Sequence, residues 1–575
     1  MAAEELSPGE RIARTAWLAV AVASCLAATG FSACSRAQSP EERNRLVATM
    51  PGEPRTLNRF VSARPAENLI ALLTQDTLVR VNRGTGELEP RLARDWSIAD
   101  DDRTYTLRLE SEATFSDGQP FTAQDVVFTF QVLYNPRIAS PMASSFEIDG
   151  QPLTARRIDD HTVEITFPAA YGPGLTILDS LPILPRHKLQ QALDAGTFTE
   201  AWNVSTPVTE VAGLGPFVLA EYAPGQRLRF TRNPRFWRAP LPHLDEIELQ
   251  IVPERNAELL RLQGGEVDVI FDFVPAEALS AMRRAEAAGA VRLMDAGVEI
   301  SADSLWFNLT PGAPAAADRP WLQREELRHA ISLAADRQAI VDTVHLGAAV
   351  SLYGPITPGH GEWYVPDLPR PPRDLAKARA LLSSIGLRDR DGDDVLEDAR
   401  GRDARFTLLT IKGNAIRERT SAMLQDHLRQ VGLVVDIAAV EPGQLQTSWS
   451  HGEYEAIYYG VTYDSFDPAR NLEYWMSSGS FHFWNAGQAK PATSWEGRID
   501  DLIRRQSTSL DSAERRRLFR EVQLIFAEHL PSIYFAAAKA TVATSARLEG
   551  VVPSVLKPPV LWNAEALSVG ANTRR

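Results

Sequence analysis

An alternation of apolar and polar residues followed by a helical pattern marks residues 90–130. Residues 105–109 alternate with a period of two, which is typical of a strand with one buried face. The Asp-Gly pair at 117–118 favours a tight turn. Thr122 can accept hydrogen bonds from the first N–H groups of a helix, and Asp125 suits its first turn. This stretch therefore predicts a strand, a turn and a capped helix, in that order.

Strand-like and helix-like patterns alternate along the remaining chain, which predicts a mixed α/β fold. The expected strands are residues 246–252, 266–271, 433–439 and 454–461. The expected helices are residues 255–263, 324–344, 375–385, 417–431, 498–507 and 512–528. No internal repeat or low-complexity tract interrupts this alternation, and the length of 575 residues predicts two to four domains.

A long apolar run lies near the start of the chain, between residues 16 and 33. Arg11 and Arg14 precede it and a polar segment follows, which is the composition of a secretory signal peptide. The Phe-Ser-Ala-Cys sequence at 31–34 resembles a bacterial lipobox, whose cysteine carries the lipid. We therefore expect residues 1–34 to be a lipoprotein signal peptide with Cys34 as its lipidation site. Residues 35–45 would then form a flexible tether.

Three alternatives remain open for this leader. The Val-Ala-Ser-Cys sequence at 22–25 is a second lipobox, but cleavage there would leave apolar residues after Cys25. The run could instead stay as an uncleaved anchor, or the protein could be secreted with an inert Cys34. Because the chain has only these two cysteines, its body is expected to have no disulfide and no thiol chemistry.

The chain is acidic, with a formal net charge of −14 at pH 7. Such a charge disfavours binding to nucleic acid or directly to an anionic membrane surface, so neither is expected as a partner. The hydrophobic share of 44% is ordinary for a globular protein. The acidic charge is compatible with cationic or zwitterionic ligands, although net charge alone decides nothing about a site.

Several segments, in a fixed order, closely resemble a known family. They are residues 90–130, Gly-Leu-Gly-Pro-Phe at 213–217, Arg-Asn-Pro-Arg-Phe-Trp at 232–237, Gly-Glu-Val-Asp at 265–268, and Leu-Arg-His-Ala-Ile at 327–331 with Asp-Arg at 336–337. The family is that of the family 5 extracellular solute-binding proteins, which are peptide, nickel and oligosaccharide receptors of ABC importers. Leu214 departs from the threonine that the family usually has there. The resemblance is strongest to the oligopeptide- and dipeptide-binding members and covers residues 46 to 570.

The resemblance implies an α/β fold of two lobes, with the ligand in the cleft between them and an extra domain inserted in one lobe. Closure of the lobes about a hinge is the usual way in which such receptors enclose a ligand. The implied boundaries are 46–77, 209–297 and 531–575 for a discontinuous first lobe, 78–208 for the inserted domain, and 298–530 for the second lobe.

The resemblance also implies a site for the ligand. In peptide-binding members an aspartate before a proline-containing turn holds the α-ammonium group of the peptide, and Asp464 matches that position ahead of Pro468. A buried ammonium needs such a partner, because an unpaired buried charge is very costly. The backbone of the peptide would pair with the strand before this aspartate and with a loop near the start of the chain. The matching residues are Gly460, Val461 and Thr462 for the strand and Ala66, Glu67 and Asn68 for the loop.

Two further features allow two interpretations each. The aromatic-rich segment after Asp464 includes Trp475 and Trp484, which either line the ligand pocket or pack within the second lobe. The acidic segment 389–398 resembles a calcium loop, but its glycine and its acidic residues do not have the spacing of an EF-hand. We therefore interpret it as a solvated turn.

Asp467 is expected to cap the helical turn that follows it rather than to bind ligand.

No sequence signature of an enzyme stands out. The chain has no HExxH, Walker A or paired CxxC motif, and its single histidines have no metal-ligand spacing, so no cofactor or intrinsic metal is expected. The S-x-x-K spelling at 554–557 lacks its usual partners and is taken as chance. The sequence therefore predicts a monomeric receptor, lipid-anchored in the periplasm or on the outer face of the cell membrane, that delivers oligopeptides to an ABC permease. An oligosaccharide or metal-chelate receptor, or a peptide-sensing or chaperone-like binder without transport, are the alternatives.

Overall fold

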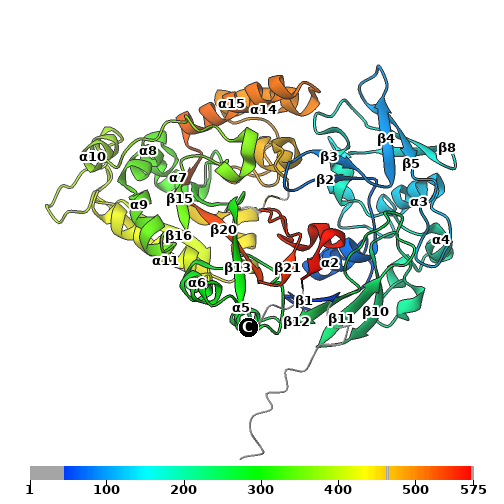
Figure 1. Cartoon of the computed structure of the whole chain (residues 1–575). Coiled ribbons are helices and arrows are strands. Elements are labelled where there is room, and N and C mark those ends of the chain that lie inside the picture. Colours follow the sequence, from blue (N-terminus) through cyan, green and yellow to red (C-terminus); the bar gives the residue numbers. More distant parts are fainter. Residues whose placement is uncertain (1–43, 461–462, 464, 571–575) are drawn as a thin grey trace, which may run out of the picture. The chain divides into compact units, whose positions relative to one another are not determined.

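The first sheet joins strands that are far apart in the sequence. The computed structural model describes residues 44–460, 463 and 465–570. In it β1 (Arg45–Met50) is parallel to β12 (Glu246–Ile251), and β11 (Arg227–Arg232) and β10 (Phe217–Ala223) continue the sheet as antiparallel strands (Figure 1). The helices of this region are α2 (Pro65–Thr74), α5 (Arg255–Gly264) and α6 (Leu279–Ala287). Pairing of β1 with β12 makes this lobe discontinuous in sequence, and its predicted boundaries stay predictions.

A second sheet is formed entirely by residues that lie between β1 and β10. Its strands are β4 (Ala93–Ile98), β5 (Thr104–Leu109), β9 (Thr162–Thr166) and β8 (Thr154–Asp159), in that order and all antiparallel. The nearby elements are the short strands β2 (Val79–Val81), β3 (Leu88–Pro90), β6 (Glu147–Ile148) and β7 (Gln151–Pro152) and the helices α3 (Ala123–Leu133) and α4 (Arg186–Ala195). Thr122 and Asp125 form a capping box at the start of α3. The predicted strand, turn and capped helix are confirmed.

The third sheet belongs to the second lobe and mixes parallel and antiparallel pairs. Its strands, in order, are β17 (Val434–Val440), β16 (Arg405–Ile411), β18 (Ala456–Gly460), β14 (Asp303–Phe307) and β19 (Ser532–Tyr534). The helices around it are α7 (Pro314–Asp318), α8 (Glu325–Ala334), α9 (Arg337–Ala339), α10 (Leu375–Ser384), α11 (Ala415–Arg429), α12 (Pro442–Ser450), α13 (Leu472–Trp475), α14 (Ser494–Thr508) and α15 (Ser512–His529). The predicted helices 375–385, 417–431, 498–507 and 512–528 and the strand 433–439 are confirmed to within a few residues.

Two long strands carry the chain between the lobes. β13 (Val291–Val298) leads to β14, and β20 (Ala536–Ser545) leads back from β19. They pair with each other in antiparallel fashion. β15 (Ala349–Ser351) pairs with residues 536–538 at the start of β20. The register shifts between Asp295 and Gly297, where Gly297 has a φ of +101°. After β20, β21 (Leu548–Glu549) pairs with β22 (Ser568–Val569).

The predicted strand at 266–271 is wrong. Only Val269 makes ladder contacts there, as isolated bridges to Ala48 on one side and Thr544 on the other. The side chain of Asp268 explains the interruption, because its carboxylate accepts hydrogen bonds from the backbone N–H of Val47 and from the guanidinium of Arg547. The carboxylate of Asp268 thus accepts from the N–H of Val47, a group that a regular strand would have paired with a backbone carbonyl group.

The predicted single helix at 324–344 is also wrong. Helix α8 ends at Ala334, and Asp336 begins a new turn by accepting a hydrogen bond from the N–H of Ala339 at 2.9 Å. Arg337 is buried at this break and donates to the carbonyl groups of Leu352 and Tyr534. The helical periodicity continues through the break, and long-range contacts that the periodicity does not encode end the helix.

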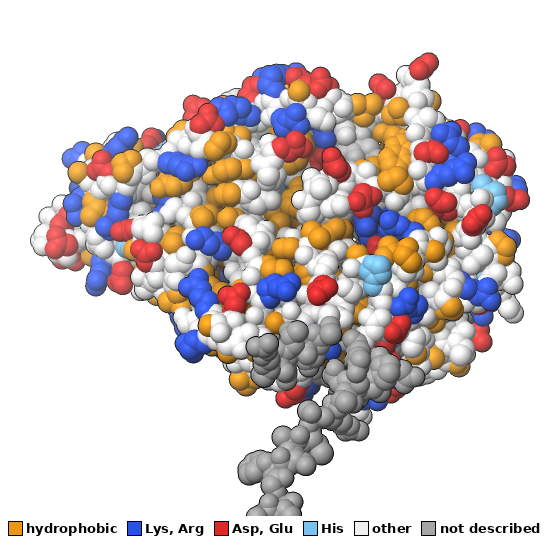
Figure 2. All heavy atoms as spheres, in the orientation of Figure 1, with side chains coloured by type: hydrophobic (Ala, Val, Ile, Leu, Met, Phe, Trp, Pro, Cys, Tyr) orange, Lys and Arg blue, Asp and Glu red, His pale blue; other side chains and the backbone are white. Residues whose placement is uncertain are grey.

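Separate hydrophobic clusters stabilise the two lobes. One cluster runs through the first two sheets and includes Leu46, Leu107 and Phe217. Another, rich in aromatic residues, fills the second lobe around Trp306 and Phe519. Acidic and basic side chains are interspersed over the face shown in Figure 2. Among the described residues, no helix combines the length and apolar character that crossing a membrane requires.

Candidate functional site

A cavity of about 390 Å³ lies where the first lobe, residues 78–208 and the second lobe meet. Its walls come from α2, from the segment between α2 and β3, from the 3-10 helix η3 (Gly174–Ser180), and from the C-terminal segment around η11 (Leu561–Ala566). Residues 465–470, which include the start of η10 (Pro468–Asn471), contribute the second-lobe wall. We call this the arginine cavity, because its lining includes Arg59, Arg80, Arg83, Arg91, Arg470 and Lys557.

Ion pairs account for part of this positive charge. Three acids, Asp76, Asp179 and Glu565, line the same cavity. Arg91 is buried and pairs with Asp76 at 2.9 Å and with Glu565 at 2.9 Å. Arg80 contacts Glu565 at 2.6 Å. Burial alone would raise the pKa of Glu565, but Arg91 and Arg80 outweigh it and lower that pKa to about 2. Glu565 is therefore ionised at neutral pH.

Two other guanidinium groups in the cavity have no such partner. Arg83 donates to the carbonyl oxygens of Leu556 and Pro558 at 3.4 and 3.2 Å, and Arg470 donates to the carbonyl oxygen of Ser145 at 3.3 Å. Among the described residues, neither has a carboxylate within ion-pair distance. Burial lowers the pKa of Arg83, and Arg80 lowers it further, while Asp179 acts in the opposite direction.

A second cavity, of about 510 Å³, lies next to the end of β18 and is lined by Glu299, after which we name it. Arg417 and Asp303 line it and form an ion pair at 2.9 Å. Burial and then the neighbouring charge of Asp272 raise the pKa of Glu299 to about 7, although Lys557 opposes this rise. Lys557 lines both cavities, so the two adjoin each other at this side chain.

The family of the chain follows from comparison with known proteins. A family model described as bacterial extracellular solute-binding proteins, family 5 (middle region), matches residues 87–483. The chain belongs to this family. Members are solute-binding receptors that serve ABC importers, so the resemblance seen in the sequence and the two-lobed α/β fold are confirmed.

Individual relatives cover nearly the whole chain. It is 26% identical over 525 residues to a probable ABC transporter-binding protein of Deinococcus radiodurans, covering 86% of this chain and 87% of the relative. It is 25% identical over 553 residues to the oligopeptide-binding protein AppA of Bacillus subtilis, covering 93% and 94%. The solved structure of NikA from Brucella suis in complex with Fe(III)-EDTA has a TM-score of 0.75 at 20% identity, covering 91% of this chain and 99% of that one. This last likeness concerns the fold.

Within this family fold, strand β18 brings the predicted peptide-pairing segment to the second cavity. Gly460 ends β18 and lines the Glu299 cavity. A Cβ atom there would lie 2.5 Å from Oδ1 of Asp303 and 2.7 Å from the carbonyl oxygen of Ala302, so only glycine fits. Val461, Thr462 and Asp464 lie outside the described residues, and their roles stay predictions. Their neighbours Ser465 and Phe466 line the arginine cavity.

The segment with Ala66, Glu67 and Asn68 is a helix, and its prediction as a loop is wrong. Pro65 begins α2, and the N–H of Asn68 donates to the carbonyl oxygen of Arg64 within the first turn. Ala66 and Glu67 are buried, and Glu67 accepts from the N–H of Arg55. Asn68 lines the arginine cavity and accepts from Nε of Arg59 at 2.7 Å. Ligand contact by these three residues stays a prediction, and Asn68 is the one at a cavity.

The two predicted tryptophans are packed inside the second lobe. Trp475 and Trp484 are each 1% exposed, and neither lines either of the two cavities. Trp475 packs edge-on against Phe519, and Nε1 of Trp484 donates to Glu496 at 3.1 Å. These contacts support the packing interpretation. Asp467 caps η10 through the N–H of Ala469, as expected, and also pairs with Arg515 at 2.6 Å.

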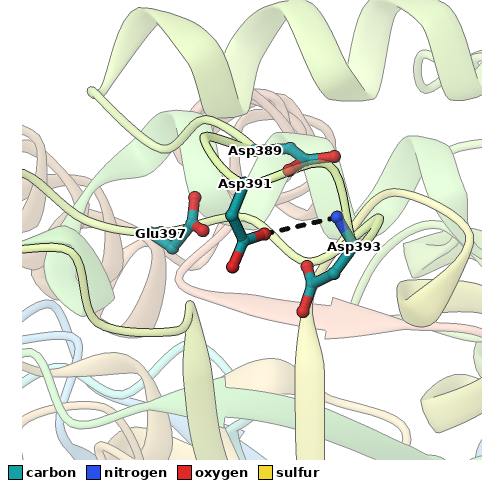
Figure 3. Close-up of side chains that lie close together, drawn as sticks. All are labelled: Asp389, Asp391, Asp393 and Glu397. Atoms are coloured by element: carbon teal, nitrogen blue, oxygen red, sulfur yellow. Dashed lines mark hydrogen bonds between the residues drawn. The ribbon is translucent and has the colours of Figure 1, made fainter.

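The acidic turn brings four carboxylates together, three of them exposed and that of Glu397 buried. Oxygens of Asp389, Asp391, Asp393 and Glu397 lie within 4.8 Å of one another (Figure 3). Such a set has the chemistry of a hard-cation site. The same oxygens accept backbone hydrogen bonds within the turn, such as those from the N–H groups of Gly392 to Asp389 and of Arg390 to Glu397. These bonds stabilise the turn without an ion, in agreement with its interpretation as a turn.

The sequence did not indicate Arg83, Arg470 or Glu299 as functional residues. Arg83 lies between two short strands, and Arg470 lies almost four hundred residues further along. No local pattern relates them, because only the folded chain brings them to one cavity.

Proposed function

We propose that this receptor binds oligopeptides between its lobes, outside the cytoplasm, and passes them to the permease of an ABC importer. The observation that carries the proposal is the pair of adjoining cavities beside the end of β18, each lined by residues of both lobes. The relative AppA, named as an oligopeptide-binding protein, supports peptide as the ligand. The receptor holds its ligand without chemistry and is not an enzyme.

The alternative of an oligosaccharide receptor has less support. Sugar rings bind well to exposed aromatic faces, and the two tryptophans that would have supplied such faces are buried in the core. Peptide backbone, in contrast, can pair with the edge of a strand such as β18 at Gly460. We therefore keep peptide as the ligand, with the backbone held by residues 460–462 and the α-ammonium group by Asp464.

The test of this function is a double comparison at Asp464. Asp464→Asn should weaken binding of a free peptide by about 3–5 kcal/mol, which is roughly a hundred- to several-thousand-fold in Kd, because a buried ammonium loses its counter-charge. An N-acetylated peptide should bind the unchanged protein poorly and lose little more in the variant, because both changes remove one pair. Isothermal titration calorimetry with both peptides on both proteins measures the cycle.

The matched control is Asp403→Asn, at an exposed aspartate away from both cavities. It should leave the affinity for the free peptide unchanged. Normal binding of free peptide by Asp464→Asn, or harmless acetylation, would show that the ammonium anchor is wrong. Native mass spectrometry of the protein as purified identifies the ligand it carries and thereby selects the peptides for the cycle.

The anchoring of the receptor is a separate part of the proposal. Cys34, which lies outside the described residues, becomes the lipidated N-terminus after cleavage of the leader. Stable attachment needs more than one acyl chain, because a single chain binds a bilayer only marginally. Cys34→Ser should therefore release the protein into the soluble fraction after cell fractionation. Recovery of the uncleaved variant in the membrane fraction would instead support the helical anchor.

A further inference from the structure

The arginine cavity has an excess of positive charge in a protein whose overall charge is strongly negative. Six cationic and three acidic side chains line it, against a net charge of −14 for the chain. The charges of Arg80 and Arg91 are balanced by ion pairs with Glu565 and Asp76. A concave, cationic wall concentrates positive potential in the cavity, which favours anions there.

Two guanidinium groups that have no carboxylate within ion-pair distance among the described residues reach the cavity from different parts of the chain. Arg83 lies between β2 and β3, and Arg470 lies in η10 of the second lobe. The hydrogen bonds of Arg83 go to backbone carbonyl groups, and those of Arg470 go to the carbonyl oxygen of Ser145 and to the hydroxyl of Tyr171. These neutral groups satisfy N–H donors without neutralising charge. Asp179 lies near both; burial raises its pKa, and the charges of Arg83 and Arg470 act against that rise.

A third polar group in the cavity has an open position. Gln75 lines the cavity, is 8% exposed, and its Oε1 has no hydrogen-bond partner among the described residues. A buried amide oxygen without a partner costs free energy that a bound donor recovers. The cavity thus offers one acceptor for an N–H or O–H group beside two donors for an anion.

We propose that the arginine cavity is a subsite for an acidic group of the ligand, a carboxylate or a phosphate, held between Arg83 and Arg470. The inference rests on the proposed function, and it narrows the preferred peptides to those with an acidic side chain. Two guanidinium groups match such a group well, because each can donate two parallel hydrogen bonds to its oxygens. A ligand held in this way joins residues 78–208 to the second lobe, so the acidic group also favours the closed arrangement.

The preference can be measured with peptides that differ in one charge. An equimolar pool of peptides of two to nine residues, made as pairs with Glu or Gln at one internal position, is incubated with ligand-free receptor, and the retained peptides are quantified by mass spectrometry. The Glu member of each pair should be enriched by on the order of 10- to 100-fold, the range expected for a charge-assisted hydrogen bond. Arg83→Gln and Arg470→Gln should each reduce this enrichment while the Gln peptides bind as before.

Two controls separate loss of the subsite from loss of the fold. Arg83→Lys keeps the charge but not the two parallel hydrogen bonds of a guanidinium, so it should restore only part of the preference, whereas Arg498→Gln, at an exposed arginine away from the cavity, should change nothing. Thermal unfolding of each variant verifies that it is folded. Equal retention of Glu and Gln peptides by the unchanged receptor, or a preference that survives both arginine substitutions, would overturn the inference and leave peptide binding intact.

Citrate and inorganic phosphate form a second arm of the experiment, followed by calorimetry. If no peptide is retained but citrate or phosphate binds and Arg83→Gln weakens it, the anionic subsite stands and its ligand is a non-peptide acid. In that case the proposed peptide function is wrong, although the anionic subsite is correct. If neither peptides nor these anions bind, both the function and the subsite are wrong.

Discussion

The arginine cavity and the Glu299 cavity each hold a carboxylic acid away from bulk water, and these acids respond in opposite directions. The pKa of Glu565 is lowered to about 2, whereas that of Glu299 is raised to about 7. Burial by itself raises both. Arg91 and Arg80 overcome it at Glu565, and Asp272 adds to it at Glu299. The sign of the neighbouring charge therefore decides the outcome, and adjoining cavities in one cleft can have different electrostatic characters.

The largest expected effect comes from removing the acid that is ionised. Glu565→Gln should lower the free energy of unfolding by about 3–5 kcal/mol, because Arg80 and Arg91 lose a buried counter-charge. Glu299→Gln is the matched control at pH 5, where the carboxyl group of Glu299, with its pKa raised to about 7, is protonated and neutral like the amide, so it should change stability by less than about 1 kcal/mol. Denaturant titration followed by circular dichroism measures both. Similar losses of unfolding free energy in the two variants would show that the two acids do not differ in their electrostatic surroundings.

A smaller effect concerns pH. The folded protein holds a proton on Glu299 with a pKa of about 7, above the ordinary value of 4.5, so it binds more protons than the unfolded chain between these pH values. Its contribution is present below pH 4.5 and is lost as pH rises to 7. Glu299→Gln should remove roughly 1–3 kcal/mol of this dependence. Glu565 acts oppositely, with stability present above pH 4.5 and lost as pH falls toward 2.

Unfolding measured at pH 5 and pH 8 in both proteins checks this expectation. Other groups titrate in the same interval, so the informative quantity is the difference between the unchanged protein and Glu299→Gln at each pH. Parallel pH profiles would mean that Glu299 is an ordinary acid and that its cavity does not differ from the arginine cavity in this respect.

The smallest effect is expected at Lys557, the side chain that both cavities share. Its ion pair with Asp272 is 2.6 Å long but half exposed, so Lys557→Met should change stability by at most about 1 kcal/mol. Because Lys557 lowers the pKa of Glu299, the same substitution should move the Glu299-linked change to higher pH. Lys539→Met, in the wall of the same cavity, is the control. An unchanged midpoint in Lys557→Met would show that its charge does not act on Glu299.

Local pattern was sufficient for much of the fold. The alternation at 105–109 and the cap at Thr122 correctly predicted β5 and α3, because short-range hydrogen bonds and one buried face determine both. The same logic was wrong at 266–271 and at 335–336. There, Asp268 takes up ladder hydrogen bonds and Asp336 caps a new turn, and neither choice is visible in periodicity. Both failures occur where side chains form long-range or capping bonds to the backbone.

The site was predictable only as far as the family resemblance reached. It indicated the end of β18, and Gly460 does line a cavity. It did not indicate the excess of charge beside it, since Arg83 and Arg470 have nothing in common in the sequence apart from their type. A cavity assembled from distant segments has an electrostatic character that depends on tertiary contacts, and these segments come together only on folding.

The pairing of β13 with β20 limits how the two lobes can move. Both connections between the lobes run in one hydrogen-bonded ribbon, so sliding one strand past the other would break its ladder from Val291–Ser545 to Val298–Lys539. Bending the ribbon at the bulge beside Gly297 preserves that ladder. We therefore expect the two lobes to rotate relative to each other about one hinge axis, located at this bulge. The hydrogen bonds from Gly172 to Ser507 and from Arg470 to Ser145 would then form and break together rather than one by one.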